Sequence, residues 1–300
     1  MTSATSAAPI LVGIDGSEPA YAAAEWAAHE ARRRAAPVRL VACYSVPFSG
    51  EPGMLGTFAV EAQATAIREE HDGFVDVAVA RVRAAVPGLT LERLVTLASP
   101  AVVLPRSAEA GGLLVVGSSG RTNRFTDLIG SVATAVCHHS SVPVVVVPAS
   151  SSKRGSDMKK IVVGTDGSES ARHALEWAYE EARLAAAELV VVHSWEYPYP
   201  DVSGSTSDTR DRMRRDAEKE LDEAVAVQAE RGRADGVIVR KHLVESAPAK
   251  ALIDESEGAD LVVVGSRGRG GFASLLLGSV SRAVVQHAHC PIAVIRHPKH

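Results

Sequence analysis

The chain has 300 residues, of which 46% are hydrophobic, 23% charged and only 4% aromatic. This length allows two domains of ordinary size, and the composition is that of a folded globular protein rather than a disordered one. A formal net charge of −4 argues against a nucleic-acid-binding protein, which would normally show a basic domain or stripe.

The first half of the chain alternates short apolar runs with helical patterns. In chain order, we predict a strand at 10–14, an Ala-rich helix around Trp26, a strand at 38–43, an irregular Pro- and Gly-containing stretch, a helix at about 59–85, a strand at 91–96, a short helix after Pro100, a strand at 113–116, a further helix and a last strand within 142–147.

The second half repeats the first. Four segments recur: 10–18 as 161–169, 114–121 as 262–269, 128–132 as 276–280, and 142–147 as 290–295. The elements between them recur in the same order, which is the signature of a duplicated domain. The segment between the copies is rich in Ser, Gly and charged residues, as in flexible linkers. We therefore predict domains at 1–149 and 159–300, joined by a linker at 150–158.

The predicted strands are continuous runs of Val, Leu and Ile rather than apolar–polar alternations, which indicates burial on both faces of a sheet. Strands separated by helices imply right-handed crossovers and parallel pairing. The predicted fold class is therefore α/β: two tandem doubly wound domains, each a five-stranded parallel sheet flanked by helices.

Two glycine motifs follow strands one and four of each half, at the sheet edge where open parallel sheets bind ligands. The first is Gly-x-Asp-Gly-Ser, at 13–17 and 164–168. The second is two glycines separated by two residues, then nine residues, then a Gly-Ser pair. Its members are Gly117, Gly120, Gly130 and Ser131 in the first half, and Gly265, Gly268, Gly278 and Ser279 in the second. The same spacing in both halves favours a ligand site.

These residues offer anion binding by the backbone. Glycine adopts positive φ and lets N–H groups approach phosphate oxygens, and the Gly-Ser pair opens a helical pattern whose free N–H groups and dipole favour an anion. Ser131 and Ser279 add hydroxyl donors. Arginines in the connecting segments are placed to pair with outer phosphates: Arg121, Arg124, Arg267 and Arg269. Taken singly, each glycine could instead serve a left-handed turn or close helix–sheet packing.

Asp15 and Asp166 end strand one of each half. A carboxylate there could accept a hydrogen bond from a nucleoside hydroxyl or be an outer-shell partner of Mg²⁺; the alternative is an Asx turn or a helix cap. Ser17 and Ser168 are better N-cap candidates because helical patterns begin just after them. We expect this to leave the aspartates free for function.

Other chemistry is poorly supported. The chain lacks the phosphate-loop pattern Gly-x₄-Gly-Lys-Ser/Thr and the Gly-x-Ser-x-Gly elbow of hydrolases. His138-His139 and His287-x-His289-Cys290 precede the last strands without further ligands at metal-like spacing, so no metal site is predicted. The charged helix at 208–222 fits a solvated surface.

Cysteine usage and the start of the chain bear on location. Cys43, Cys137 and Cys290 show no paired spacing, and an odd count suits a reducing compartment. The N-terminal residues lack the basic and apolar regions of a signal peptide, and no apolar run approaches the ~20 residues that span a bilayer. We expect a cytoplasmic protein without a membrane or nucleic-acid partner.

The long glycine signature, the aspartate after strand one and the last Pro-containing strand together resemble the ATP-binding universal stress proteins. The resemblance covers almost the whole chain, as in the tandem two-domain members of actinobacteria. It implies an adenine nucleotide alpha-hydrolase-like fold and ATP, with or without Mg²⁺, as ligand. It also implies association through the last strand, and therefore an internal pseudo-dimer and a homodimer of chains. Ser119 and Arg267 differ at the position before the second signature glycine, so the two sites need not be equal.

The resemblance also implies the binding residues. Those contacting adenosine are Gly13, Ile14 and Asp15, and Gly164, Thr165 and Asp166. The adenine edge meets the main chain near Ala42 and Val192. Ribose and phosphates meet Val116, Gly117, Gly120, Gly130, Ser131 and Val132, and Val264, Gly265, Gly268, Gly278, Ser279 and Val280; Arg121 and Arg267 are added from their place in the connecting segments.

The leading functional hypothesis is a nucleotide-dependent regulatory module of the stress response, because the two phosphate-binding motifs come without an obvious nucleophile or general base. It would act through an unidentified protein partner. The alternative is a slow ATPase or adenylyl-transfer enzyme. A third, an interaction scaffold with empty sites, is disfavoured because neither signature has degenerated.

Overall fold

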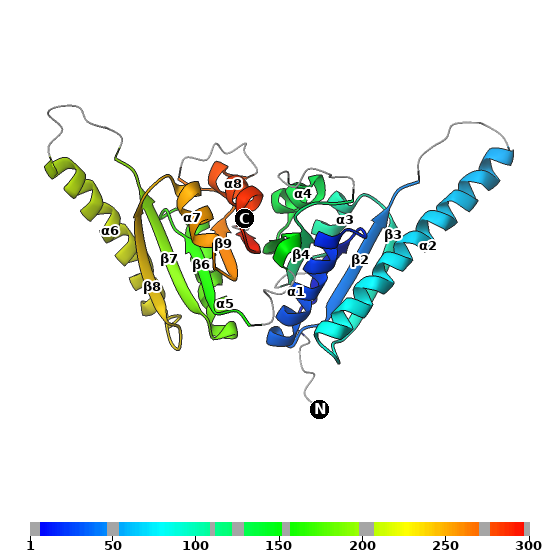
Figure 1. Cartoon of the computed structure of the whole chain (residues 1–300), viewed down its shortest axis with the longest axis horizontal. Coiled ribbons are helices and arrows are strands. Elements are labelled where there is room, and N and C mark those ends of the chain that lie inside the picture. The colour runs from blue at the N-terminus through cyan, green and yellow to red at the C-terminus, as the bar shows by residue number, and fades with distance from the viewer. Residues whose placement is uncertain are drawn as a thin grey trace. The chain divides into compact units, whose positions relative to one another are not determined.

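The computed structural model describes residues 7–46, 54–108, 112–121, 129–151, 157–197, 207–269 and 277–296. The chain divides into two compact units, Met1–Gly155 and Ser156–His300 (Figure 1). Each unit is an α/β domain with a parallel sheet, as predicted.

Unit 1 contains the described elements β1 (Ile10–Ile14), α1 (Glu18–Arg34), β2 (Val38–Tyr44), α2 (Met54–Ala85), β3 (Leu91–Leu97), α3 (Pro100–Ser107), β4 (Leu113–Gly117), α4 (Ser131–His139), β5 (Val144–Val147) and a short 3₁₀ helix, η1 (Ala149–Ser151). Its strands pair in parallel in the order β3-β2-β1-β4-β5.

Unit 2 contains β6 (Lys160–Gly164), α5 (Glu169–Ala185), β7 (Glu188–Trp195), α6 (Ser207–Glu230), β8 (Val239–Glu245), α7 (Pro248–Ser256), β9 (Leu261–Gly265), α8 (Ser279–His287) and β10 (Ile292–Ile295). The strand order is again β8-β7-β6-β9-β10, all parallel. From the sequence, the counterpart of the strand at 91–96 is expected at 237–243. The observed β8 begins two residues later, because the Val237 N–H donates to the carbonyl oxygen of Ala234 in a turn.

The direction of strand progression reverses beside the first strand of each unit. Successive crossovers move from β1 to β2 to β3 and then jump to β4 and β5 on the other side. Right-handed crossovers therefore place α1 and α2 on one face of the sheet and α3 and α4 on the other, and each pair packs together. The reversal leaves an opening beyond the carboxyl ends of β1 and β4, and of β6 and β9 in unit 2, where doubly wound sheets bind ligands.

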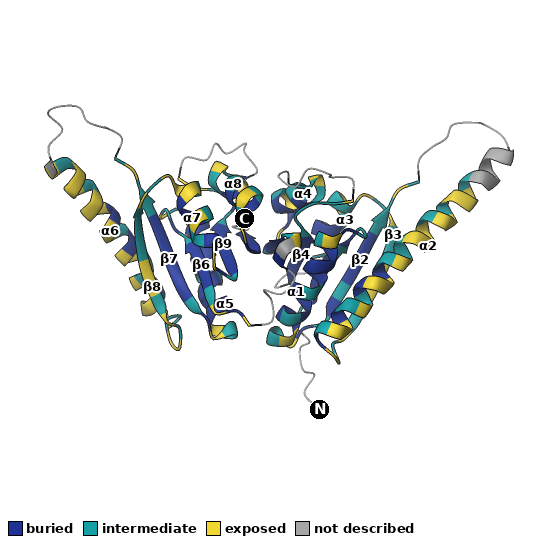
Figure 2. Cartoon of the chain, viewed as in Figure 1, coloured by how far each residue is buried: buried dark blue, intermediate teal, exposed yellow. Residues whose placement is uncertain are grey.

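The cores consist of the central strands and the first helices (Figure 2). The face of α1 toward the sheet is mainly alanine with Trp26, all fully buried, and small side chains let a helix lie close to the strands. The prediction that every strand is buried on both faces is wrong for β3 and β8. They flank the sheet at one end, and Leu97 of β3 remains 59% exposed.

Candidate functional site

The turn after the first strand has the same geometry in both units. Gly16 and Gly167 adopt left-handed conformations, with φ of +84° and +73°, which glycine adopts without steric cost. The Ser17 and Ser168 hydroxyls then cap α1 and α5 by accepting from the N–H groups of Ala20 and Ala171. The predicted N-caps are confirmed.

The aspartates of this turn are already engaged. Oδ1 of Asp15 accepts from the backbone N–H and the hydroxyl of Ser17, at 3.0 and 2.6 Å. Oδ1 of Asp166 accepts from the N–H of Ser168 at 2.9 Å. The expectation that the serine caps leave the aspartates free is wrong, because Asx turns and N-caps coexist here. The second carboxylate oxygen of Asp166 accepts from the N–H of Arg269 at 3.0 Å and so reaches the signature loop.

The signature glycines serve close approach rather than positive φ. Their φ angles lie outside the left-handed region, contrary to one of the two roles expected for them. A Cβ on Gly265 would lie 2.8 Å from backbone atoms of Ser170, and one on Gly117 would lie 2.6 Å from Pro19. These two glycines therefore let the first helix pack onto the sheet. Gly120 and Gly268 bring the loop against the Asp15 and Asp166 carboxylates.

The Gly-Ser pair opens a helix in each unit, as predicted. Gly130 and Gly278 are the N-caps of α4 and α8, and neither supplies a side-chain cap. The first N–H groups of a helix lack intrahelical acceptors and carry the positive end of its dipole. The N-terminus of α8 therefore offers donors to an anion.

Unit 2 holds a cavity of about 720 Å³ at this position, within the size range of small-molecule sites. It collects every site residue predicted for the second half: Gly164, Thr165, Asp166, Val192, Val264, Gly265, Arg267, Gly268, Gly278, Ser279 and Val280. The geometry thus joins both glycine motifs of this unit, although they lie about a hundred residues apart in the sequence.

The sequence reasoning missed the wall contributed by α6 and the end of β7. The additional lining residues are Ala171, His193, Ser194, Trp195, Met213, Asp216, Ala217, Glu220, Pro248, Leu252 and Ser281. Arg269, which the sequence predicts as a phosphate partner, lines the cavity as well. The signal was present in α6, where Ala217 and Leu221 are buried with helical spacing inside a charged segment. Strand register also corrects one pairing: Gly13 lies opposite Val41 and Gly164 opposite Val192, so the counterpart of Ala42 is His193.

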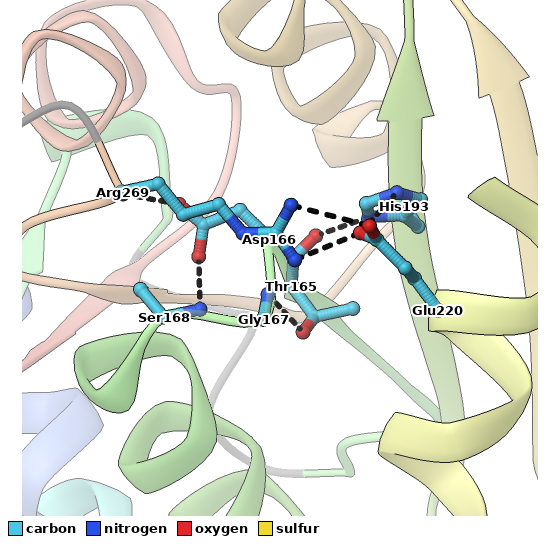
Figure 3. A network of polar contacts seen from close by, with 7 residues as sticks. All are labelled: Thr165, Asp166, Gly167, Ser168, His193, Glu220 and Arg269. Carbon is cyan, nitrogen blue, oxygen red and sulfur yellow. Dashed lines mark hydrogen bonds and ion pairs between the residues drawn. The ribbon is translucent and has the colours of Figure 1, made fainter. Parts of the chain in front are cut away.

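A polar network crosses the cavity wall (Figure 3). His193 Nδ1 lies 2.8 Å from the carbonyl oxygen of Thr165, and His193 Nε2 lies 3.6 Å from Glu220 Oε2. The Arg269 guanidinium donates to both carboxylate oxygens of Glu220, at 2.8 and 3.3 Å. The turn after β6, the end of β7, the helix α6 and the signature loop are thereby joined by side chains.

Unit 1 brings its predicted residues to the same sheet edge, but different side chains of the second helix face them. The ion pairs Asp76–Arg93 and Asp222–Lys241 occupy equivalent places on the second helix and third strand of each unit. Phe74 lies two residues before Asp76, and Glu220 lies two residues before Asp222, so Phe74 of α2 corresponds to Glu220 of α6. The predicted residues Gly13, Ile14, Asp15, Val116, Gly117 and Gly120 lie at the ends of β1 and β4, Gly130, Ser131 and Val132 start α4, and Ala42 is buried in β2.

The unit 1 wall is aromatic. The Phe74 ring lies directly over Gly16, whose Cβ, if present, would lie 2.8 Å from it. His71 contacts both Phe74 and Tyr44, with ring centroids 5.2 and 5.7 Å apart. Arg121 lies over the Phe74 ring at 4.7 Å and pairs with Glu70 at 3.1 Å. Arg124 lies outside the described residues.

Among the described residues, no group of three or more His, Cys, Asp or Glu side chains could hold a metal ion. No helix in the same part of the chain has the length and apolarity to cross a membrane.

The fold and the site define a class of protein: tandem doubly wound α/β units, each with a glycine-built site at the carboxyl ends of its parallel strands. The model of the universal stress protein family matches residues 7–148 and 158–296. The chain belongs to the universal stress protein family, as a tandem two-domain member.

Relatives span the whole chain. It is 33% identical over 290 residues to a universal stress protein of Mycolicibacterium smegmatis, covering 96% of each sequence. It is also 33% identical over 311 residues to one of Mycobacterium tuberculosis, covering 99% of each. A crystal structure of a universal stress protein from Archaeoglobus fulgidus shares the fold, with a TM-score of 0.65 and 21% identity over 96% of this chain and 98% of that one.

Proposed function

We propose that this chain binds an adenine nucleotide, ATP above all, in the cavity of unit 2 and acts as a nucleotide-dependent regulatory module of the stress response. The observation that supports this most directly is the composition of the cavity wall. Glycine-exposed backbone and the start of α8 form one side, and the ends of β6 and β7 form another. The first suits phosphates and the second a base and sugar.

Different residues of the unit 2 cavity would bind the phosphates, the ribose and the base of the nucleotide. The N–H groups of Ser279 and Val280, with the Ser279 hydroxyl, would bind phosphate oxygens. The backbone at the end of β7 would meet the adenine edge, and the Asp166 carboxylate would accept from a ribose hydroxyl. The apolar lining includes Val192, Met213 and Leu252 and would bury the base. Unit 1 carries the same motifs and is proposed as a second, unequal site.

A slow ATPase or adenylyl-transfer activity is the second candidate, and one observation favours it. Glu220 and His193 line the cavity and lie 3.6 Å apart, so a carboxylate and an imidazole are available for proton transfer. Release of phosphate or pyrophosphate, measured with the wild-type chain and a Glu220→Gln variant, separates the two. Turnover that depends on Glu220 would favour the enzyme.

Calorimetric titration of the purified chain with ATP tests the proposal. Ser279→Asp places a carboxylate where phosphate should bind, yet Ser279 is exposed and an acidic residue in a first helical turn is favourable. The fold should survive while ATP affinity in unit 2 falls at least about tenfold, or ~1.4 kcal/mol. Ser131→Asp is the matched control, with the same change in unit 1. Undetectable binding of ATP to the wild type at millimolar concentration would refute the proposal.

Two finer expectations accompany it. We propose a cytoplasmic location, supported by three cysteines that remain thiols. We propose that chains form a homodimer, on the strength of the family resemblance. Light scattering on the purified chain tests the dimer, and fractionation of cells tests the location.

A further inference from the structure

Arg269 spans the site between the signature loop and α6. Its backbone N–H donates to Asp166, and its guanidinium passes over Gly167, where a Cβ would collide with it. The guanidinium then donates hydrogen bonds to both carboxylate oxygens of Glu220 (Figure 3). Since Gly268, Arg269 and Glu220 all line the cavity, this ion pair links the proposed phosphate side of the site to the helix on the opposite wall.

The Arg269–Glu220 ion pair has two hydrogen bonds, but another anion can readily replace the Glu220 carboxylate. The side chains of Arg269 and Glu220 are 55% and 40% exposed, and ion pairs so open to solvent contribute little to stability. A di- or triphosphate carries more charge than a carboxylate and offers several oxygens to a planar guanidinium. Arg269 should therefore prefer a polyphosphate to Glu220. A nucleoside monophosphate has fewer charges with which to compete.

From this geometry we infer that Arg269 and Glu220 form a latch that selects nucleotides by their outer phosphates and reports their binding to α6. In the empty site Arg269 is held by Glu220; with ATP bound, Arg269 moves to the outer phosphates and Glu220 is left with its contact to His193. This inference rests on the proposed nucleotide site and specifies which nucleotides occupy it and what they change.

The consequence for α6 follows from its other ties. Arg210 near its start, with a side chain that is 57% exposed, pairs with Glu245 of β8, and Asp222 pairs with Lys241. Ala217 and Leu221 are its buried anchors in this region. When the Glu220–Arg269 pair is lost, the turns of α6 around Ala217 lose their tie to the signature loop, while Glu220 keeps its contact with His193. These turns should open more often when ATP is bound.

Unit 1 lacks this arrangement. Its equivalent arginine, Arg121, lies over the Phe74 ring and pairs with Glu70 at 3.1 Å. A phosphate would have to detach Arg121 from an aromatic face as well as from a carboxylate. The latch is thus a property of unit 2.

The test uses the full chain, ATP and AMP as probes, and three variants. Glu220→Gln removes the competing charge with little change of shape, Arg269→Gln removes the phosphate ligand, and Glu218→Gln is the control. Glu218 is an exposed carboxylate of the same helix that does not line the cavity. Calorimetry gives the affinities, and hydrogen exchange followed by mass spectrometry reports the opening of residues 208–220.

We expect Glu220→Gln to bind ATP about three- to tenfold more tightly and AMP within twofold of the wild type. Arg269→Gln should lose about tenfold for ATP and little for AMP. ATP should accelerate exchange at 208–220 in the wild type, and Glu220→Gln should show that fast exchange without ATP. Glu218→Gln should behave as the wild type in both assays.

Two failures are distinguishable. If no variant and no wild-type sample binds ATP, the proposed function fails and the latch with it. If ATP binds the wild type and both Glu220→Gln and Arg269→Gln with equal affinity, and exchange at 208–220 is unchanged or slower with ATP, the latch is refuted while the nucleotide site stands.

Discussion

The carboxylate of Asp166 and the backbone N–H of Arg269 are joined by a hydrogen bond of 3.0 Å (Figure 3). The other carboxylate oxygen holds the turn that starts α5. One side chain thus fixes the positions of both glycine motifs. We expect Asp166→Ala to lower the free energy of unfolding by about 1–2 kcal/mol, because two N–H groups lose their acceptor.

The same substitution should weaken ATP binding in unit 2, since the loop after β9 would no longer be held against the turn. Urea unfolding and calorimetry measure the two effects. Asp15→Ala is the counterpart in unit 1 and should lower stability while leaving the affinity of unit 2 unchanged. Tight ATP binding by Asp166→Ala would show that the carboxylate is dispensable to the site.

Gly265 is predicted to be a packing residue. A Cβ on Gly265 would lie 2.8 Å from backbone atoms of Ser170. Gly265→Ala must therefore push α5 away from the sheet. We expect a loss of about 2 kcal/mol of stability, typical of overpacked interiors. Gly278→Ala would meet its nearest atom only at 3.4 Å and should unfold close to the wild-type urea concentration. Equal stabilities of the two variants would contradict this distinction.

Much of the fold follows from the repeat. The apolar runs and the two serine caps fix the order and type of the elements. The glycine motifs, together with the family resemblance that they carry, point to eleven residues of the second half that line one cavity. Local patterns are sufficient for this because strands, caps and tight turns depend mainly on neighbouring residues. The role of each glycine was less accessible, since a residue without a Cβ reveals a close approach only when the approaching chain is known.

The α6 wall is not predictable in this way. Glu220 stands in a strongly charged helix whose sequence fits a solvated surface, and only tertiary packing turns it toward His193 and Arg269. The sequence likewise does not predict that Phe74 of unit 1 takes the place of this carboxylate. The lengths of the loops before α2 and α6 differ, so the equivalence appears only through ion pairs such as Asp76–Arg93 and Asp222–Lys241.

His29 of α1 gives a pH dependence. Burial first, and then the positive charges of Arg32 and Arg33, hold the pKa of this imidazole below its ordinary value of about 6.5. Above pH 7 the group is neutral in both folded and unfolded chains. As pH falls through about 6.5, the unfolded chain takes up the proton first, so the free energy of unfolding decreases.

We expect His29→Gln to reduce this acid sensitivity between pH 7 and the lowered pKa. The measurement is urea unfolding at a series of pH values. His289→Gln, at an exposed position, is the control and should keep the wild-type slope. An unchanged slope in His29→Gln would mean that other groups account for the effect.

The cysteines should be unreactive in the folded chain. Burial raises the pKa of the Cys43 thiol to about 11 and that of Cys137 to about 12, and Cys290 is fully buried. Thiolate, the reactive species, is therefore scarce at neutral pH. Titration with a disulfide reagent at pH 7.5 should proceed slowly, and unfolding in guanidinium should expose three thiols. A thiol that reacts at once in the native chain would contradict the prediction and make redox control worth testing.

Phe74 provides the last prediction, which concerns unit 1 alone. Its ring covers the Gly16 turn, and the Arg121 guanidinium lies over the same ring, 4.7 Å from its centroid. A nucleotide in unit 1 would have to displace the ring and give up a cation–π contact worth about 0.5–1 kcal/mol. In a chain whose unit 2 is blocked by Ser279→Asp, Phe74→Ala should therefore strengthen ATP binding about threefold. Calorimetry on the double variant and on Ser279→Asp alone measures the difference. Weaker binding after removal of the ring would mean that Phe74 stacks on the base instead, and that unit 1 recognises its ligand through the aromatic wall of Tyr44, His71 and Phe74.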